Sequence, residues 1–195
     1  MIWLTLLLAT VAVFFVQLGF PNFFLQYFAF TPILALKMPW TFVTSIFLHA
    51  GFTHIFFNML ALFSFGPYLE RKLGSKNFLV LYFLSGIVGN LLFMLLSLRP
   101  EIPAVGASGA IFGILGALAV LEPALVIFVG FVPMPIWMAT IFWVILEGLG
   151  AFDPANPIGS AAHLGGLFFG MAFALYYKKF LRKKREEEFF FSAHY

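Results

Sequence analysis

The chain has 195 residues, of which 63% are hydrophobic, only 10% are charged and 29 are phenylalanine. A soluble domain of this size does not bury so much apolar surface, so the composition excludes that class and indicates an integral membrane protein. The formal net charge is +3 and cysteine is absent, which excludes disulfides, thiolate zinc sites and a cysteine nucleophile. Because the basic residues gather at the ends of apolar segments, we expect the lipid bilayer, and not nucleic acid, as the anionic partner.

Apolar runs follow one another along the chain and predict an all-α membrane protein with six transmembrane helices. Hydrocarbon accepts only helices or closed barrels as spanning elements, and continuous runs favour helices over the alternating pattern of a barrel. These segments form one predicted domain, residues 1–180, followed by a charged and aromatic cytoplasmic tail, residues 181–195. The predicted segments are residues 2–20, 52–69, 77–97, 107–121, 124–146 and 161–179.

The first apolar segment and the stretch that follows it complete the predicted layout. The first segment has neither a basic flank nor a small-residue cleavage site, so we expect a retained helix and not a signal peptide. The stretch from Pro21 to Gly51 is rich in Phe, Pro and Trp. That composition predicts a first loop that lies along the membrane without crossing it.

The distribution of basic residues predicts the orientation in the membrane. Loops rich in Lys and Arg stay in the cytoplasm. We therefore expect both termini in the cytoplasm of a prokaryote, with the protein in its plasma membrane and the loops after the first, third and fifth segments on the external side. Nine basic residues support the cytoplasmic side and two lie on the other: Arg71, Lys72, Lys76, Lys178, Lys179, Arg182, Lys183, Lys184 and Arg185 against Lys37 and Arg99.

The fourth segment is too short to span the bilayer, and Ser108 stands at its start. From Ser108 to Glu122 the helix measures about 22 Å at 1.5 Å per residue, against about 30 Å of hydrocarbon. We therefore expect Ser108 to lie below the external surface, beside irregular backbone that lines a water-filled cavity. A helix N-terminus also presents unpaired N–H groups to a developing oxyanion. The alternative is that Ser108 only caps the helix.

His163 opens the last segment on the same predicted side as Ser108. An imidazole at membrane depth is functional by default, and its natural use beside a hydroxyl is to deprotonate a nucleophile. Small residues on both helices predict that their backbones pack closely enough for Ser108 and His163 to meet. These supporting glycines are Gly106, Gly109, Gly113 and Gly116 around the fourth segment, and Gly166 and Gly170 on the sixth.

The second segment offers two hydrogen-bond donors on one helix face. His54 and Asn58 are four residues apart, so both can point into the same cavity and stabilise an oxyanion. His49 lies five residues before His54, about 140° around a helix, which is poor geometry for chelating one metal ion. We expect no metal site, and a buried structural role for His49 stays open.

The types and positions of the eight acidic residues exclude two other classes of membrane protease. The chain has a single Asp, whereas an aspartyl enzyme needs two, and it lacks the His-Glu-x-x-His motif of a zinc protease. No carboxylate is placed to orient His163, so a Ser–His dyad is expected and not a triad. Outside the tail, the acids fall at segment ends or in loops: Glu70, Glu101, Glu122, Glu147 and Asp153.

Taken together, these motifs resemble the rhomboid family of intramembrane serine proteases, from about Trp40 to Tyr177. The resemblance implies a prokaryotic-type six-helix core that cleaves single-pass transmembrane proteins without a cofactor. It implies Ser108 as nucleophile, His163 as general base, and His54 and Asn58 with the Ser108 N–H as oxyanion donors. One departure is Trp40-Thr41, where many members have Trp-Arg near the end of the first loop.

Two other classes of function stay open from the sequence. A catalytically inactive relative that binds membrane proteins would share the fold, although such proteins usually lack the serine or the histidine, and this chain has both. A channel or transporter that uses histidines as proton relays would need acids or paired sites along a path through the membrane. The sequence does not predict an oligomeric state.

Overall fold

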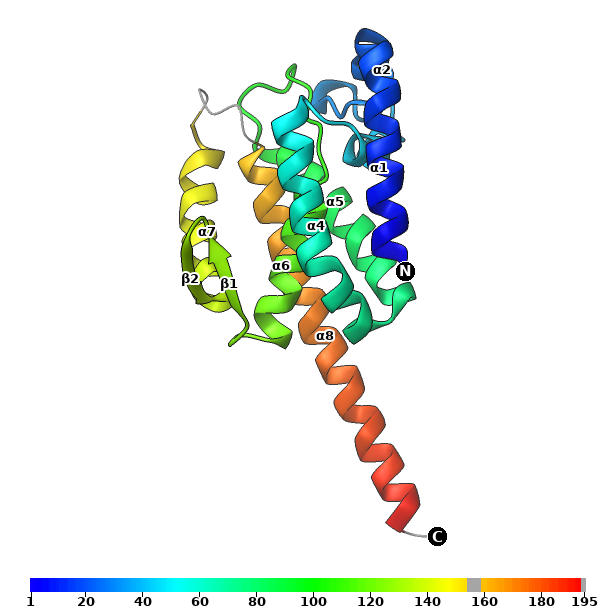
Figure 1. Ribbon diagram of the computed structural model, residues 1–195, viewed down its shortest axis with the longest axis vertical. Coiled ribbons are helices and arrows are strands. Elements are labelled where there is room, and N and C mark those ends of the chain that lie inside the picture. The colour runs from blue at the N-terminus through cyan, green and yellow to red at the C-terminus, as the bar shows by residue number, and fades with distance from the viewer. Residues whose placement is uncertain (154–158, 194–195) are drawn as a thin grey trace.

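Helices dominate the computed structural model, which describes residues 1–153 and 159–193 (Figure 1). A long N-terminal helix is followed by short helical pieces, four further helices, a hairpin between the third and fourth of these, and a last helix that runs far past the others. In chain order the elements are α1 Ile2–Gly19, α2 Pro21–Phe28, η1 Pro32–Leu34, α3 Thr41–Thr44, η2 Ser45–Phe47, α4 Phe52–Leu73, α5 Ser75–Leu96, α6 Ser108–Leu121, β1 Val126–Val129, β2 Val132–Pro135, α7 Ile136–Ala151 and α8 Ser160–Ala193.

Three of these helices have the length and composition of membrane spans. Over the described residues, α1, α4 and α5 are long and apolar enough to cross a bilayer, while α6 and α7 are shorter apolar helices. This confirms a mostly helical membrane protein. The expected tail, residues 181–195, continues α8 as helix through Ala193, and residues 194 and 195 lie outside the described part.

The segment expected as one helix over residues 124–146 is wrong in its first half. Strands β1 and β2 form an antiparallel hairpin in which Val129 pairs with Val132, and α7 begins only at Ile136. Gly130, with φ of +62°, occupies the first turn position, where a two-residue hairpin loop needs a positive φ. Pro133 and Pro135 also disfavour a helix, because proline lacks the backbone N–H that a helix interior needs. The prediction was wrong because an apolar run alone does not distinguish a buried strand from a helix.

Helix α6 lies in the centre of the bundle and contacts α4, α5, α7 and α8 (Figure 1). Its closest neighbour is α8, and glycines set the approach. A Cβ on Gly166 would lie 1.9 Å from the carbonyl oxygen of Gly109, and a Cβ on Gly170 would lie 2.0 Å from that of Gly113. The two backbones are therefore in direct contact, as the small-residue faces predicted.

The connection between α1 and α4 is folded onto the bundle by backbone and side-chain hydrogen bonds. Phe30 and Ala104 exchange N–H···O bonds of 3.0 and 2.7 Å, which join this connection to the loop before α6. The Trp40 indole N–H donates to the Tyr27 carbonyl at 2.8 Å, and the Thr41 hydroxyl donates to the Met38 carbonyl at 2.6 Å. The Thr41 hydroxyl thus serves local backbone bonding.

His49 is anchored to α1 through its backbone and is buried through its ring. The Gln17 amide donates to the His49 carbonyl at 2.8 Å and accepts the His49 N–H at 3.1 Å. The residue is 1% exposed, and neither ring nitrogen has a hydrogen-bond partner among the described residues. Burial, aided by the neighbouring His54 ring, lowers the pKa of His49 to about 4, so the ring is neutral at physiological pH.

Replacing Gly170 by alanine should destabilise the bundle, because the added methyl would overlap a backbone oxygen of α6. We expect a loss of about 1–3 kcal/mol, measured as a lower midpoint of thermal unfolding in detergent. The matched control is Gly148→Ala in α7, where no atom lies within 4 Å of the added Cβ. That variant should be as stable as the wild type or slightly more so, and equal losses in both would contradict the packing role of Gly170.

His49 should make the protein sensitive to acid. Its pKa is lower in the folded state than the ordinary value of 6.5, so the unfolded chain binds the extra proton and stability falls as pH drops from 6.5 towards 4. One pKa unit corresponds to about 1.4 kcal/mol, which gives a loss of about 3 kcal/mol by the bottom of this window. Unfolding followed across the window should show His49→Phe losing less stability than the wild type, and parallel pH curves would contradict this assignment.

Candidate active site

Ser108 is the first residue of α6, and its side chain faces α8. The N-cap position is Ala107, and no side chain caps this helix, so Ser108 does not act as its cap. Instead the Ser108 Oγ lies 2.7 Å from the Nε2 of His163. The structure therefore joins the two residues on which the sequence argument rested, and it does so across the glycine-packed contact between α6 and α8.

The His163 ring is contacted on its face by an aromatic ring as well as at its edge by Ser108. His163 lies in the first turn of α8, where its N–H donates to the Gly159 carbonyl at 3.1 Å. The Phe112 ring stacks on the imidazole with centroids 4.5 Å apart and planes 5° from parallel. Phe112 follows Ser108 by four residues, so both side chains lie on the same face of α6. This face positions the Ser108 hydroxyl and the plane of the imidazole together.

Glu147 of α7 contacts the other nitrogen of the same ring, which corrects the sequence prediction. Its Oε1 lies 3.0 Å from the Nδ1 of His163, and the two side chains are only 15% and 11% exposed. The expectation that no carboxylate faces His163 is therefore wrong. The hairpin displaces α7 along the chain, so that Glu147 lies inside the helix and not beyond its end. The sequence feature that could have indicated this contact is Glu147 itself, a single carboxylate within a long apolar run.

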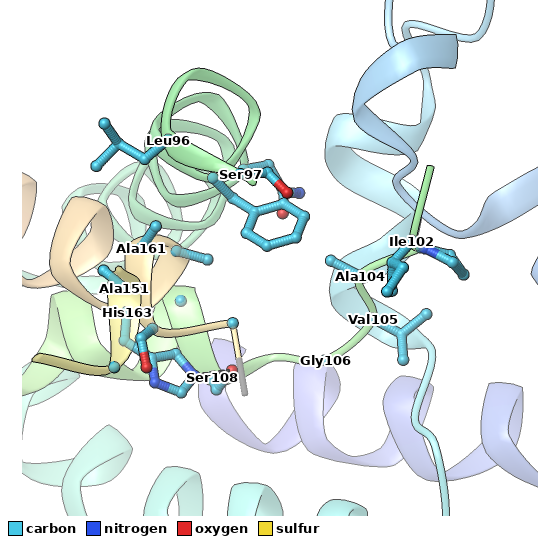
Figure 2. Close-up of a pocket in the computed structure, with 18 of the residues that line it drawn as sticks. Leu96, Ser97, Ile102, Ala104, Val105, Gly106, Ser108, Ala151, Ala161 and His163 are labelled. Carbon is cyan, nitrogen blue, oxygen red and sulfur yellow. Dashed lines mark hydrogen bonds between the residues drawn. The ribbon is translucent and has the colours of Figure 1, made fainter. Parts of the chain in front are cut away.

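A cavity of about 730 Å³ opens above the Ser108–His163 pair. Figure 2 shows the two side chains pointing toward each other, while Ile102, Ala104 and Val105 of the loop before α6 border another side of the pocket. Polar groups such as Arg99 and Asn90 also line it. The arrangement gives the hydroxyl a space that can admit both water and an extended peptide.

His54 of α4 lies at the same cavity and approaches the turn before Ser108. The Ala50 N–H donates to its Nδ1 at 3.4 Å, which leaves Nε2 to carry the ring proton toward the cavity. A Cβ on Gly106 would lie 2.8 Å from this Nε2, and Gly106 has φ of +131°. Both the space and the backbone conformation therefore require glycine at this position.

Asn58 and His49 are near the cavity but do not line it. Asn58 lies one turn beyond His54 on α4, is buried, and has no partner for its Nδ2 within the described part of the chain. The His49 ring packs against that of His54, with centroids 4.9 Å apart. Among residues 1–153 and 159–180, no three His, Cys, Asp or Glu side chains gather in a way that could hold a metal ion.

Comparisons with known proteins all point to one protein family. Residues 36–180 match the model of the Rhomboid domain family. "Rhomboid protein 1, mitochondrial" of Saccharomyces cerevisiae is 38% identical over 150 residues, which cover 74% of this chain and 43% of the relative. "Rhomboid protease GluP" of Bacillus subtilis is 37% identical over 135 residues, covering 67% and 24%. "Inactive RHOMBOID-like protein 8" of Arabidopsis thaliana is 42% identical over 79 residues, covering 40% and 22%.

The family match covers most of the chain, whereas the chain spans less than half the length of each of these relatives. The matched range contains Ser108, His163, His54, Asn58 and Glu147. On the strength of this match, of the identities and of the helical membrane fold, the chain belongs to the rhomboid family.

Proposed function

We propose that this chain is an intramembrane serine protease that hydrolyses peptide bonds in or near the transmembrane segments of single-pass membrane proteins. The contact of 2.7 Å between the Ser108 hydroxyl and the His163 ring, at the edge of the cavity, carries the proposal. A hydroxyl and an imidazole in hydrogen-bond reach are the elements of an activated nucleophile. The family relative named as a protease in Bacillus subtilis supports the same activity.

The proposed membrane arrangement places this pair below the external surface. Six helices, namely α1 and α4 to α8, cross the membrane within one domain, residues 1–180, and the connection between α1 and α4 lies along the surface. The 14 residues of α6 measure about 21 Å, less than the hydrocarbon thickness, so its Ser108 end is recessed. At its other end Lys72 pairs with Glu122, on the side that carries most of the basic residues.

This topology has both termini in the cytoplasm and the cavity open to the external side. A prokaryotic plasma membrane is the proposed location. The tail, residues 181–195, lies in the cytoplasm, and no cofactor is required.

Peptide cleavage proceeds in two acyl-transfer steps. The Ser108 Oγ attacks the carbonyl carbon of the scissile bond while its proton moves to the Nε2 of His163. The tetrahedral intermediate then collapses, the C–N bond breaks, and His163 gives the proton to the leaving amine. A water molecule from the cavity then attacks the acyl-enzyme and gives a proton to His163. The ester C–O bond breaks, His163 returns the proton to the Ser108 Oγ, and the carboxylic acid leaves.

Charge on the carbonyl oxygen is stabilised from the α4 side of the cavity. The Ser108 N–H at the start of α6 belongs to the group of donors that a helix leaves unpaired. His54 offers its Nε2–H to the cavity, and Asn58 brings an amide with no partner among the described residues. Donors that are in place before charge develops lower the barrier without reorganisation.

Ser108→Ala and His163→Ala should each abolish cleavage while the protein stays folded. Because Ser108 and His163 act together in the same step, the double variant should be no slower than either single variant. Cleavage of a panel of single-pass substrates in liposomes measures the activity, and thermal unfolding in detergent checks the fold. Covalent labelling by a fluorophosphonate should occur in the wild type and be lost in Ser108→Ala.

The opposite results would identify another function. A wild-type protein that binds these substrates without cleaving them, and that is not labelled, would indicate an inactive relative. Proton flux through the protein with no labelling would indicate a channel or transporter. Substantial residual cleavage in Ser108→Ala would contradict the assignment of the nucleophile.

Asn58→Ala and His54→Ala should slow turnover with little change in KM. Loss of one preorganised donor typically lowers the rate by about a hundred- to a thousandfold, and the remaining donors should still allow slow labelling by a fluorophosphonate. His49→Phe is the control, because His49 precedes α4 and does not share the helix face that carries His54 and Asn58. If His49→Phe lowers kcat more than both other variants at equal folded yield, the donors must be reassigned.

A further inference from the structure

Glu147 occupies a place that the Ser108–His163 mechanism alone does not explain. It lies on α7, and its Oε1 is 3.0 Å from the Nδ1 of His163, the nitrogen that does not face Ser108. The carboxylate also hydrogen-bonds the Ser160 side chain, which belongs to the start of α8. Two hydrogen bonds thus fix this carboxylate between α7 and the first turn of α8, where it is mostly buried.

The two contacts of the His163 ring select one neutral tautomer. An ionised carboxylate has no hydrogen to donate, so the contact with Glu147 requires the proton on Nδ1. Nε2 then has a free lone pair, and the Ser108 hydroxyl donates to it at 2.7 Å. This is the form in which the ring accepts the serine proton. The other tautomer would place a hydrogen on Nε2 and a lone pair against the carboxylate.

We propose that Glu147 is a positioning residue for this site, which makes the pair a Ser–His–Glu arrangement. The carboxylate keeps the proton of His163 on Nδ1, holds the ring in the plane set by Phe112, and balances the positive charge that forms when Nε2 takes the serine proton. The proposal rests on the proposed function of Ser108 and His163, and it gives α7 a direct part in the reaction.

The simplest test replaces the carboxylate by an amide of the same shape. Glu147→Gln should lower kcat on a cleaved single-pass substrate by about ten thousandfold, with KM unchanged, since the third member of such a unit acts on the reacting state and not on substrate binding. The rate of fluorophosphonate labelling should fall in parallel. Glu147→Asp, which keeps the charge on a shorter side chain, should recover part of the loss.

The matched control is Glu101→Gln, the same chemical change at an exposed carboxylate that pairs with Arg99 in the loop before α6. It should keep the wild-type kcat. A Glu147→Gln variant with wild-type kcat, in a protein whose activity still depends on Ser108, would overturn this inference and leave the proposed function standing. A rise in KM or a loss of folded yield as the main effect would also overturn it, because both indicate a purely structural contact.

A second measurement does not depend on activity. The chain has four histidines, so selective ¹⁵N labelling and NMR can resolve the ring nitrogens in detergent. In the inactive Ser108→Ala background, neutral His163 should be protonated on Nδ1, and adding Glu147→Gln should shift part of the population to Nε2–H. An unchanged tautomer would overturn the positioning role. If the wild type neither cleaves nor labels, the proposed function fails, and this tautomer ratio still decides whether Glu147 orients the ring.

Discussion

The close approach of two helix backbones is the constraint on which the site depends. In hydrocarbon no hydrophobic driving force pulls helices together, so contact relies on small residues that allow van der Waals packing. Gly166 rests on the carbonyl of Gly109, and Gly170 rests on that of Gly113, so the same step of four residues is used on both helices. Ser108 precedes the first of these contacts by one residue. The register of the glycines therefore also sets the distance between hydroxyl and imidazole.

The sequence allowed this half of the site to be predicted because it depends on residue types that are costly in lipid. A serine and a histidine at the starts of two apolar helices, with glycines on the facing surfaces, leave few other arrangements. The hairpin of β1 and β2 was missed because apolar strands and apolar helices look alike in composition. Glu147 was missed for the same reason, since its place in the last part of α7 follows only when the start of that helix is known.

Hydrogen bonding differs between the two sides of the cavity. On the α8 side, both ring nitrogens of His163 are bonded in the resting state, to Ser108 and to Glu147. On the α4 side, the Asn58 amide nitrogen is buried without a partner among the described residues. Unpaired buried donors are costly in a folded protein, and a substrate oxygen would give them a partner. In the proposed mechanism, the His163 base is therefore held in place before substrate binds, while the proposed oxyanion donor Asn58 gains a partner only when substrate is bound.

Helix α7 contacts the Ser108–His163 pair through Glu147, although few of its residues are buried. Its buried residues, Ile136, Ala139 and Thr140, all lie near its start, whereas Glu147 lies near its end. That end is tied inward by Trp143 against Phe112 and by Glu147 against His163. Charge-assisted hydrogen bonds are strong where water is scarce, so the contact between Glu147 and His163 strengthens this attachment. The carboxylate that we propose orients His163 therefore also contributes to holding the end of α7 in place.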